Sequence, residues 1–480
     1  MSWRGRRVTV MGLGLFGGGL GATRYLARQG AEVLVTDLRN AEALEPSLAG
    51  LRDLPVRYRL GEHLEKDFVE TDGIVANPAV PWSSPFLEAA RAAGVPVTTE
   101  LGLFLGASPA RLIAVTGSNG KSTVTSLIGR ALERSGLRTF VGGNLGGSLL
   151  DHVDELRAED RVVLEMSSFQ LEALSESGLA PWISVVTSLS PNHLDRHGTW
   201  ERYVAAKGEV LRNQGPKGIA ILNGDDPGVR AEMAGLGRAR RLWFGADAMS
   251  DAFVDGADGV WHSPESGRRE ALFDRSRLRL LGRFNAQNAL AAAVAARVAG
   301  ADPASTAAAI ESFQGLPHRL ELAGQVRGAL WVNDSKATNP AATIAALHAL
   351  DRPVVVLIGG RNKGMDPSEL ASVVRGRARA AVCFGEMASE LREALRVPPI
   401  PVALAPDLSS ACAAASTLAQ PGDAVLLSPG FASFDEFQSF EQRGERFREI
   451  VRRLEIEWSE DARPIDLGGM PRENARGVEA

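Results

Sequence analysis

The most specific chemical signal in the chain is a glycine-rich stretch, Thr116–Thr123, with the sequence Thr-Gly-Ser-Asn-Gly-Lys-Ser-Thr. It follows an apolar run, Leu112–Thr116, and precedes a helical pattern, Val124–Ser135. Glycines allow several backbone N–H groups to face one anion, and the positive end of the following helix faces the same anion. Lys121 would contact terminal phosphates, and the Ser122 hydroxyl would contact Mg²⁺. The stretch therefore predicts a binding loop for a nucleoside triphosphate.

The spacing in this stretch is shorter than in the common phosphate loop. The pattern is G-x-x-G-K-S, because the position where the longer motif requires its first glycine is Val115. A chance glycine turn with an exposed lysine is the alternative. The order of strand, loop and helix favours phosphate binding, since it places the loop at the carboxyl end of a buried strand.

Three further polar groups follow in the same part of the chain. Glu165 comes directly after the expected strand Arg161–Leu164, where a carboxylate can contact phosphate-bound Mg²⁺. His193 lies in a polar loop after the expected strand Ile183–Leu189, and Lys207 lies among small apolar residues of a helical pattern. Each has an ordinary structural alternative: an exposed strand end, a solvated turn and a lysine on a helix surface. Their positions after the phosphate loop favour a functional role.

A second glycine motif opens the chain. The segment Gly12–Gly17 matches G-x-G-x-x-G after a strand and before a helix, and Asp37 lies about 20 residues later. By itself this fingerprint is typical of a nicotinamide or flavin enzyme. What it recognises physically is a diphosphate at a helix N-terminus, and a UDP-sugar offers the same group. The motif therefore predicts a diphosphate ligand and leaves its identity open.

Short apolar runs alternate with helical patterns, which predicts an α/β fold with mostly parallel strands. We expect three domains: a Rossmann-like domain over residues 1–98, a central P-loop-type ATPase domain over 99–316 and a C-terminal Rossmann-like domain over 317–480. The tail after about residue 464 is polar and glycine-rich and is expected to be loosely ordered. The other expected elements are the strands Arg7–Met11, Glu32–Thr36, Gly73–Ala76, Val354–Ile358, Ala380–Phe384 and Ala424–Leu427, and the helix Asn288–Val298.

Bulk composition excludes several classes of protein. With 53 basic and 58 acidic residues, the chain lacks the charge footprint of a nucleic-acid-binding protein. Its two cysteines, Cys383 and Cys412, cannot form a disulfide framework or a cysteine metal site, which fits a cytoplasmic protein. The apolar run Val8–Leu20 is interrupted by five glycines, so it is not a signal peptide, and no run reaches the roughly 18 residues that a membrane span needs.

In their order along the chain, these motifs resemble the Mur ligase family, and the resemblance extends to about residue 455. The front motif is similar to the UDP domain of the alanine-adding and glutamate-adding members, and the ending Leu427–Gly444 is similar to that of the glutamate-adding members. The stretches that resemble the family pattern are Thr116–Thr123, Glu165–Glu172, Asn192–His197, Ala205–Lys207, Leu316–Arg319 and Asn333–Asn339.

The resemblance implies an ATP-dependent ligase of peptidoglycan precursor synthesis. The carboxylate of UDP-N-acetylmuramoyl-L-alanine would attack the γ-phosphate of ATP to give an acyl phosphate, and the amine of D-glutamate would then displace phosphate. It also implies two Mg²⁺ ions, one at Ser122 and Glu165 and one at His193 and Lys207. A protonated lysine cannot bind Mg²⁺, so the family pattern implies that Lys207 is carbamylated by CO₂, which requires a lowered amine pKa.

The same resemblance assigns the remaining site residues. Lys121, Glu165, His193 and Lys207 would be catalytic. ATP would be bound by Gly117, Ser118, Asn119, Gly120, Lys121, Ser122, Thr123, Asn288, Arg319, Asp334 and Lys336. The UDP-substrate would be bound by Gly14, Leu15, Phe16, Asp37, Arg39, Asn144 and His193. Glutamate would be bound by Thr338, Lys363, Ser433, Phe434 and Phe440. Phe16, Leu38 and Asn192 depart from the family's usual residues.

Other classes remain as alternatives at this point. An oxidoreductase built on the front fingerprint would leave the central phosphate loop unexplained. A non-catalytic partner of a cell-wall complex on a Mur-like scaffold would not need Lys121, Glu165, His193 and Lys207 together. Within the ligases, the alanine-adding member and a folate-type or other polyglutamate ligase are the nearest alternatives, and the folate-type enzyme would not need the UDP-type front domain. We expect a monomer whose third domain closes over the centre when ligands bind. The chirality of the added glutamate depends on pocket geometry, which the sequence leaves open.

Overall fold

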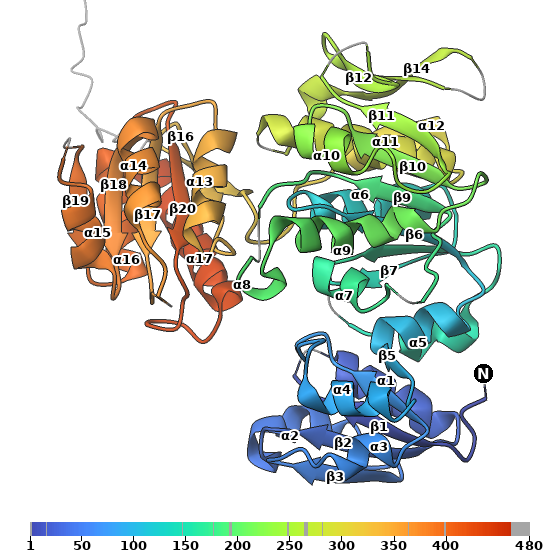
Figure 1. The fold of residues 1–480 in the computed structure, drawn as a ribbon. Helices are drawn as coiled ribbons and strands as arrows, with labels where there is room; N and C mark the ends of the chain where they lie inside the picture. Colours follow the sequence, from blue (N-terminus) through green and yellow to red (C-terminus); the bar gives the residue numbers. More distant parts are fainter. Residues whose placement is uncertain are drawn as a thin grey trace, which may run out of the picture. The chain divides into compact units, whose positions relative to one another are not determined.

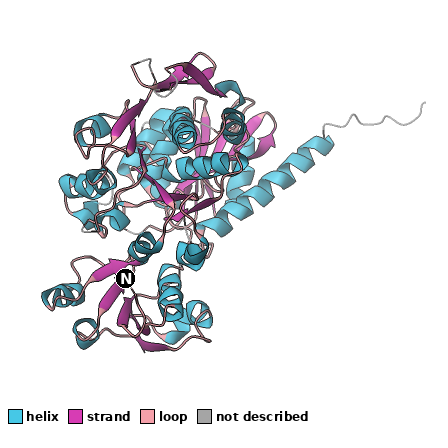
Figure 2. Ribbon diagram, turned by 90° about the vertical axis from the view of Figure 1, so that its right-hand side faces the viewer, coloured by secondary structure: helices cyan, strands magenta, loops and turns pink. Residues whose placement is uncertain are grey.

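The structure is a computed structural model. It describes residues 2–15, 17–145, 147–175, 177–191, 194–246, 249–263, 267–280, 282–362, 364–397 and 400–461. The chain separates into two compact units, Met1–Phe313 and Gln314–Ala480. Three sheets, each dominated by parallel strands and flanked by helices, confirm the predicted α/β class (Figures 1 and 2).

The first sheet contains five parallel strands in the order β3-β2-β1-β4-β5. The strand order reverses between β1 and β4, and in such sheets ligands bind outside the carboxyl ends of the strands at the reversal. The glycine motif leaves β1 at this position. The elements are β1 (Arg7–Met11), α1 (Gly18–Arg28), β2 (Glu32–Asp37), α2 (Ala41–Ala49), β3 (Val56–Leu60), α3 (Lys66–Val69), β4 (Gly73–Ala76), α4 (Pro85–Ala92) and β5 (Val97–Thr99).

The second sheet has the order β14-β13-β12-β11-β10-β9-β6-β8-β7 and belongs to the same unit. Its strands are parallel except at one end, where β12, β13 and β14 pair antiparallel. The strands are β6 (Arg111–Thr116), β7 (Thr139–Gly143), β8 (Arg161–Glu165), β9 (Ile183–Val186), β10 (Ile219–Asn223), β11 (Arg240–Phe244), β12 (Ala252–Asp255), β13 (Asp258–His262) and β14 (Arg269–Asp274). The helices are α5 (Glu100–Ala107), α6 (Lys121–Arg134), η1 (Leu149–Glu155), α7 (Ser168–Glu172), α8 (Leu194–His197), α9 (Trp200–Arg212), α10 (Pro227–Glu232), η2 (Arg275–Arg277), α11 (Arg283–Val298) and α12 (Pro303–Glu311).

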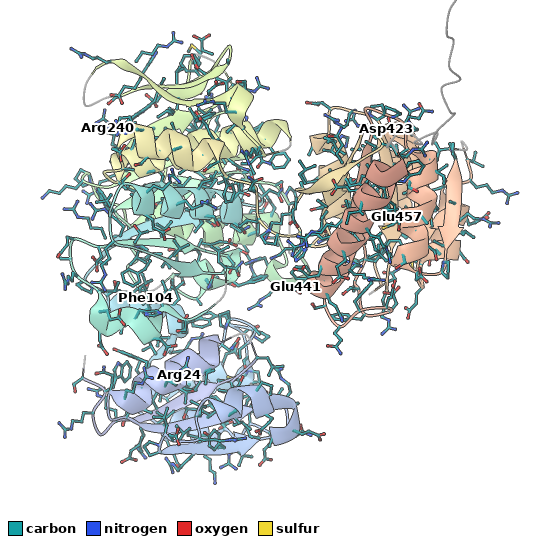
Figure 3. All side chains as sticks on the ribbon, turned by 180° about the vertical axis from the view of Figure 1, so that it is seen from behind. Arg24, Phe104, Arg240, Asp423, Glu441 and Glu457 are labelled. Atoms are coloured by element: carbon teal, nitrogen blue, oxygen red, sulfur yellow. The ribbon has the colours of Figure 1, made fainter. Side chains whose placement is uncertain are left out.

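The third sheet, in the second unit, has the order β15-β16-β20-β17-β18-β19, with only β15 antiparallel to its neighbour. Its long last helix presents charged residues such as Glu441 and Glu457 to solvent (Figure 3). The elements are β15 (Glu321–Val326), β16 (Ala329–Asn333), α13 (Pro340–Ala349), β17 (Val354–Gly359), α14 (Ser368–Arg377), β18 (Ala378–Phe384), α15 (Ala388–Ala394), β19 (Val402–Ala405), α16 (Leu408–Leu418), β20 (Ala424–Gly430) and α17 (Phe440–Asp461).

Two predicted boundaries differ from the structure beside the phosphate loop. The strand expected to reach Leu189 ends at Val186, because the Thr187 hydroxyl turns to the loop and donates to the Asn119 carbonyl. The helix expected from Val124 begins at Lys121, directly after Gly120 in the left-handed conformation. Both differences arise because the loop is bound tightly to its neighbours. The predicted loose tail lies outside the described residues.

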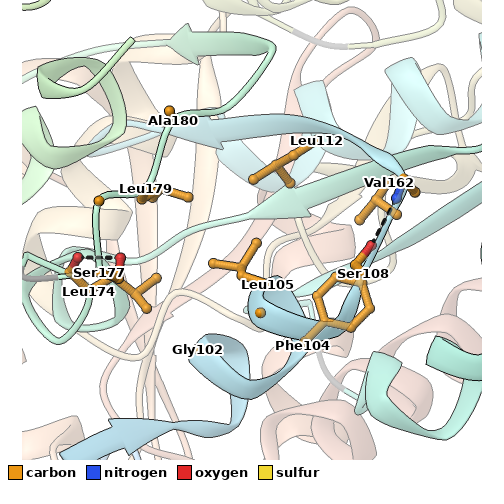
Figure 4. A pocket seen from close by; sticks show the side chains of 13 residues that line it. Gly102, Phe104, Leu105, Ser108, Leu112, Val162, Leu174, Ser177, Leu179 and Ala180 are labelled. Atoms are coloured by element: carbon orange, nitrogen blue, oxygen red, sulfur yellow. Dashed lines mark hydrogen bonds between the residues drawn. The ribbon is translucent and has the colours of Figure 1, made fainter. Parts of the chain in front are cut away.

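A cavity of about 310 Å³ lies away from this loop (Figure 4). It is lined by apolar side chains such as Phe104 of α5 and Leu179, and by residues near the amino ends of β6 and β8, Leu112 and Val162. Ligands of parallel sheets bind at the carboxyl ends of strands. None of the predicted site residues that the structure describes lines this cavity, so it is separate from the described part of the candidate site.

Candidate active site

The phosphate loop leaves β6 at its carboxyl end and depends on two glycines. Gly117 has a φ of 147° and Gly120 a φ of 83°, both outside the range that other residues adopt easily. An added Cβ at Gly117 would lie 2.0 Å from Thr187 Oγ1, and one at Gly120 would lie 2.4 Å from Asn288 Oδ1. The loop therefore accepts no side chain at either position, and the predicted residue Asn288 packs directly against it.

Two lysines converge on one carbonyl of the loop. Lys121 Nζ donates to Gly117 O at 2.9 Å and to Ser118 O at 3.0 Å, and Lys207 Nζ donates to Gly117 O at 2.7 Å. Lys207 is 2% exposed, so the alternative of a surface lysine is wrong. Burial lowers the pKa of Lys207 well below its ordinary value, and the nearby Lys121 charge lowers it further, while Glu165 opposes the shift. This site therefore favours a neutral amine on α9.

Glu165 is a buried carboxylate at the end of β8, with 1% of its surface exposed. Its Oε1 accepts a 2.8 Å hydrogen bond from Asn144 Nδ2. Its Oε2 is buried and has no hydrogen-bond partner among the described residues. A buried carboxylate oxygen without a partner is costly, and a hard cation such as Mg²⁺ prefers oxygen ligands. Together with the buried hydroxyl-bearing residue Ser122 at the start of α6, Glu165 therefore fits a Mg²⁺ site.

The described residues contain no group of three or more His, Cys, Asp or Glu side chains that could bind a metal on their own. This is compatible with Mg²⁺, which commonly takes one or two protein ligands and fills its shell with water and substrate phosphates. His193, the predicted ligand of a second ion, lies outside the described residues.

The structure adds one residue that the sequence reasoning missed. Tyr203 is 1% exposed, and its hydroxyl lies 2.8 Å from Ser118 Oγ in the phosphate loop. Its ring lies 5.0 Å from Lys207 Nζ. Tyr203 and Lys207 are four residues apart on α9, and helical residues at this spacing face the same side. That spacing was the signal in the sequence that could have identified Tyr203.

The glycine motif of the first sheet is fixed by Asp37. The two carboxylate oxygens of Asp37 accept hydrogen bonds from the backbone N–H groups of Gly14, at 3.2 Å, and Arg39, at 2.9 Å. These bonds bring together three residues predicted to bind the UDP-substrate, Gly14, Asp37 and Arg39. Leu15 is 46% exposed at the same loop, and Phe16 lies outside the described residues.

In this fingerprint the third glycine, here Gly17, is expected to allow close packing of helix against strand. In the structure, Gly19 has that role instead. An added Cβ at Gly19 would lie 2.3 Å from Leu13 O, whereas one at Gly17 would lie 3.9 Å from Gly147 Cα, its nearest described atom beyond the adjoining residues. Gly17 instead has the left-handed conformation that starts α1. Gly17 is therefore required for the turn, and Gly19 for the packing of helix against strand.

In the second unit, Asp334 follows β16 and fixes the backbone around Arg319. Asp334 Oδ1 accepts from Leu320 N at 3.2 Å, and Asp334 Oδ2 accepts from Ser428 Oγ at 2.8 Å. Both neighbours of Arg319 have positive φ, 61° at His318 and 44° at Leu320. Residues other than glycine adopt this conformation at an energetic cost and do so most often at functional sites. The exposed Arg319 side chain is thus presented by a strained turn.

The residues predicted to bind glutamate are dispersed around the ends of β16 and β20. Lys336, which was predicted to bind ATP, has its Nζ 5.1 Å from the ring centre of Phe440, which was predicted to bind glutamate, so these two residues are brought together. Ser433 is buried and Phe434 is half exposed in the loop after β20, while Thr338 is partly buried. Lys363 lies outside the described residues.

Burial raises the pKa of Asp334 to about 7, against the opposing hydrogen bonds from Ser428 and Leu320 and the Arg319 charge. The protonated form is therefore favoured by folding, and this contribution is present below about pH 4 and lost as the pH rises through about 7. Asp334→Asn should thus become more stable relative to the parent protein between pH 4 and 7. The gain should be on the order of 4 kcal/mol, at about 1.4 kcal/mol per pKa unit. Urea unfolding across this pH range measures it.

The matched control for this change is Asp366→Asn. Asp366 is exposed, and hydrogen bonds from Ser368 lower its pKa, so its contribution has the opposite sign. A stability difference between Asp334→Asn and the parent protein that is constant from pH 4 to 7 would contradict the raised pKa.

The family is decided by comparison with known proteins. Residues 6–99 match the model of the "Mur ligase MurD-like, N-terminal domain", residues 115–296 that of the "Mur ligase middle domain", and residues 318–431 that of the "Mur ligase, glutamate ligase domain". A UDP-N-acetylmuramoylalanine–D-glutamate ligase of Roseiflexus sp. is 42% identical, with 94% of this chain and 99% of the relative covered. The chain belongs to the Mur ligase family. The predicted family is therefore confirmed.

Further Mur ligase relatives and structures agree. UDP-N-acetylmuramoylalanine–D-glutamate ligase of Anaeromyxobacter dehalogenans is 40% identical over 93% of this chain and 98% of its own. Among solved structures, the UDP-N-acetylmuramate–alanine ligase MurC of Thermotoga maritima has a TM-score of 0.58 at 18% identity, covering 93% of this chain and 99% of its own. MurF ligase of Thermotoga maritima in complex with ADP has a TM-score of 0.57 at 18% identity, covering 96% of each chain. At these identities the structures establish the shared fold.

No helix within the described part of the chain combines the length and apolar character needed to cross a membrane.

Proposed function

We propose that this Mur ligase adds D-glutamate to UDP-N-acetylmuramoyl-L-alanine with conversion of ATP to ADP and phosphate, the reaction EC 6.3.2.9 of peptidoglycan precursor synthesis. The similarity to glutamate-adding relatives over 94% of the chain supports this substrate pair. The observation that supports the chemistry is the meeting of Lys121, the buried Lys207 and the buried carboxylate of Glu165 at one phosphate loop. Glu165 Oε2 has no hydrogen-bond partner among the described residues. An oxidoreductase would have no use for this arrangement.

The difficulty of the reaction is that two anions, the alanyl carboxylate and the γ-phosphate, must approach each other. Lys121 lies on the loop itself and would neutralise charge that develops on the transferred phosphoryl group. Asn288 and Tyr203 contact the loop from α11 and α9 and would fix its conformation. Bound Mg²⁺ would supply further charge neutralisation at the phosphates, with Ser122 and Glu165 as its protein ligands.

Lys207 is proposed to be carbamylated. The neutral ε-amine attacks CO₂, a C–N bond forms, and one proton leaves, which converts the lysine into a carboxylate. Its burial among apolar residues and the repulsion from Lys121 both favour the neutral amine that this reaction requires. With His193, the carbamate would bind a second Mg²⁺.

The other assignments follow the same proposal. Arg319, Asp334 and Lys336 would bind ATP with the phosphate-loop residues. Gly14, Leu15, Phe16, Asp37, Arg39, Asn144 and His193 would bind the UDP-substrate, and Thr338, Lys363, Ser433, Phe434 and Phe440 would bind glutamate. Because these groups belong to both units, we propose that the second unit closes when ligands bind. The domain limits 1–98, 99–316 and 317–480, a monomeric state and a cytosolic location belong to the same proposal.

The decisive experiment is phosphate release with ATP, Mg²⁺ and UDP-N-acetylmuramoyl-L-alanine, with D-glutamate, L-glutamate and L-alanine offered separately. We expect release with D-glutamate only, together with a product heavier by one glutamyl residue. Release with L-glutamate instead would keep the mechanism and overturn the stereochemical assignment. Absence of release with all three amino acids would overturn the proposed activity.

A further inference from the structure

Arg196, on the short helix α8, reaches the first sheet's ligand region. Its Nη2 donates to Pro78 O at 2.9 Å and to Val80 O at 3.3 Å. These carbonyls belong to the loop that follows β4, at the carboxyl end of the strand beside β1. Arg196 is therefore a direct contact between the region after β9 and the loop after β4.

The loop after β4 is in turn bonded to the glycine motif. Asn77 Nδ2 donates to Gly12 O at 3.3 Å, and Asn77 Oδ1 accepts from Ala79 N at 3.0 Å. An added Cβ at Gly12 would lie 3.0 Å from Asn77 Cβ, so the two backbones approach closely. A displacement of Pro78 and its neighbours would therefore shift the backbone of the glycine motif.

On its other side, Arg196 begins a stack of rings. Its guanidinium lies 4.1 Å from the ring centre of Phe169 on α7, which stacks on His197 with centres 5.2 Å apart and planes at 16°. His197 meets Tyr203 of α9 edge-on at 5.5 Å. His197 Nε2 also lies 2.9 Å from Ser168 Oγ. We call Arg196, Phe169, His197 and Tyr203 the aromatic stack.

The aromatic stack ends at the phosphate loop. The Tyr203 hydroxyl lies 2.8 Å from Ser118 Oγ, and the Tyr203 ring lies 5.0 Å from Lys207 Nζ. Ser118 Oγ is also 2.9 Å from Ser190 O, which precedes α8. His197 and Tyr203 are both almost fully buried. Closely packed buried rings move together rather than independently, because the interior has little free volume.

We infer that Arg196 is a positioning residue that couples the two ligand loops, so that occupation of the diphosphate loop by the UDP-substrate strengthens ATP binding at Gly117–Thr123. This inference rests on the proposed function, since it names the two ligands of that site. The Arg196 guanidinium donates hydrogen bonds to main-chain carbonyls in the loop after β4, and it also stacks on the Phe169 ring. A shift of those carbonyls changes where the guanidinium lies, and the stack carries that change to Tyr203 and Ser118.

Coupling of this kind is a difference in binding free energy, and it is reciprocal. The probes are UDP-N-acetylmuramoyl-L-alanine and a non-hydrolysable ATP analogue with Mg²⁺. Calorimetry gives the Kd of the analogue without and with saturating UDP-substrate. For the parent protein we expect the UDP-substrate to lower the Kd of the analogue by about 5-fold or more.

Arg196→Met retains an apolar side chain of similar length over Phe169 but removes the donors to Pro78 and Val80. We expect it to reduce the coupling factor below about 2 while the Kd of each ligand alone stays within about 2-fold of the parent value. Arg196→Lys, which keeps a charged donor, should restore part of the coupling. Arg202→Met is the matched control, because Arg202 is exposed on the neighbouring helix α9.

Phe169→Leu interrupts the aromatic stack at its second member and should lower the coupling as well. If the coupling runs through the stack, the double variant should lose no more coupling than either single variant. A parent protein without coupling, or an Arg196→Met variant with the parent coupling factor, would overturn the inference. A variant that weakens both ligands equally would show a merely structural role. Failure of the parent protein to bind the UDP-substrate at all would instead refute the proposed function.

Discussion

Replacing Lys207 with methionine is expected to lower kcat on the order of 10³-fold or more while the protein stays folded. The physical reason is that Lys207 lies at the phosphate loop, 2.7 Å from Gly117 O, and is the residue proposed to become a carboxylate ligand. Methionine has a similar length but can neither donate to Gly117 nor react with CO₂. Steady-state phosphate release measures the loss.

The stability of the same variant separates catalysis from folding. Burial lowers the pKa of Lys207, so between this lowered pKa and the ordinary lysine pKa of about 10 the unfolded chain binds a proton that the folded chain does not. Burying this lysine therefore costs stability at neutral pH, and Lys207→Met should be at least as stable as the parent protein in urea. Lys217→Met, which removes an exposed lysine, should leave both activity and stability unchanged. A destabilised Lys207→Met protein would contradict the lowered pKa.

The carbamate itself has a direct signature. With ¹³C-bicarbonate, the parent protein should show a carbamate carbon signal in ¹³C NMR that Lys207→Met lacks. Lys121→Met should weaken the signal at neutral pH, because the Lys121 charge helps to keep the Lys207 amine neutral. A parent protein without this signal, and with unchanged activity after removal of CO₂, would rule out the carbamate.

The sequence predicted the architecture well because the relevant signals are local. Strand ends such as Met11 and Ala76 were predicted correctly, since apolar runs and the residues that terminate them are adjacent in the chain. The phosphate loop was also predicted, because strand, glycines and helix follow each other directly. The end of β9 was predicted three residues too late, because contacts of Thr187 with Asn119, 68 residues away, decide it.

The environment of individual site residues was beyond the sequence. A lysine in a helical pattern is compatible with either surface or core, and burial of Lys207 depends on the packing of α9 against β6 and of α7 against α9. Asp334 and Ser428 are bonded across 94 residues, so neither the buried carboxylate nor its raised pKa could be seen in the chain. The four-residue spacing of Tyr203 from Lys207 is visible in the sequence. The sequence does not show that Tyr203 contacts the phosphate loop, and without that contact the spacing does not indicate a site residue.

Replacing Arg443 with methionine should lower the unfolding free energy of the second unit by about 2–4 kcal/mol. Arg443 is 1% exposed on α17, and burial lowers its pKa to about 10. Its guanidinium donates to the Ser335 hydroxyl and carbonyl at 3.0 and 2.9 Å, and to the Phe431 carbonyl at 3.2 Å. Methionine would remove these donors from the buried Ser335 and Phe431 carbonyls, and each buried group left unsatisfied costs about 1–3 kcal/mol. The Ser335 hydroxyl would keep its bond to the Phe440 carbonyl.

The same guanidinium ties together two segments proposed to serve different ligands, since Ser335 lies between Asp334 and Lys336 while Phe431 precedes Ser433. We therefore expect Arg443→Met to raise the KM for ATP and for glutamate together. Hydrogen exchange resolved by peptide localises the stability loss: protection should fall within Gln314–Asp461 and remain unchanged in the first unit. Arg446→Met, which removes an arginine whose ion pair with Glu449 lies on the surface of the same helix, should change stability by less than about 0.5 kcal/mol. Equal effects of the two substitutions would mean that loss of a positive charge on α17, rather than the buried bonds to Ser335 and Phe431, determines stability there.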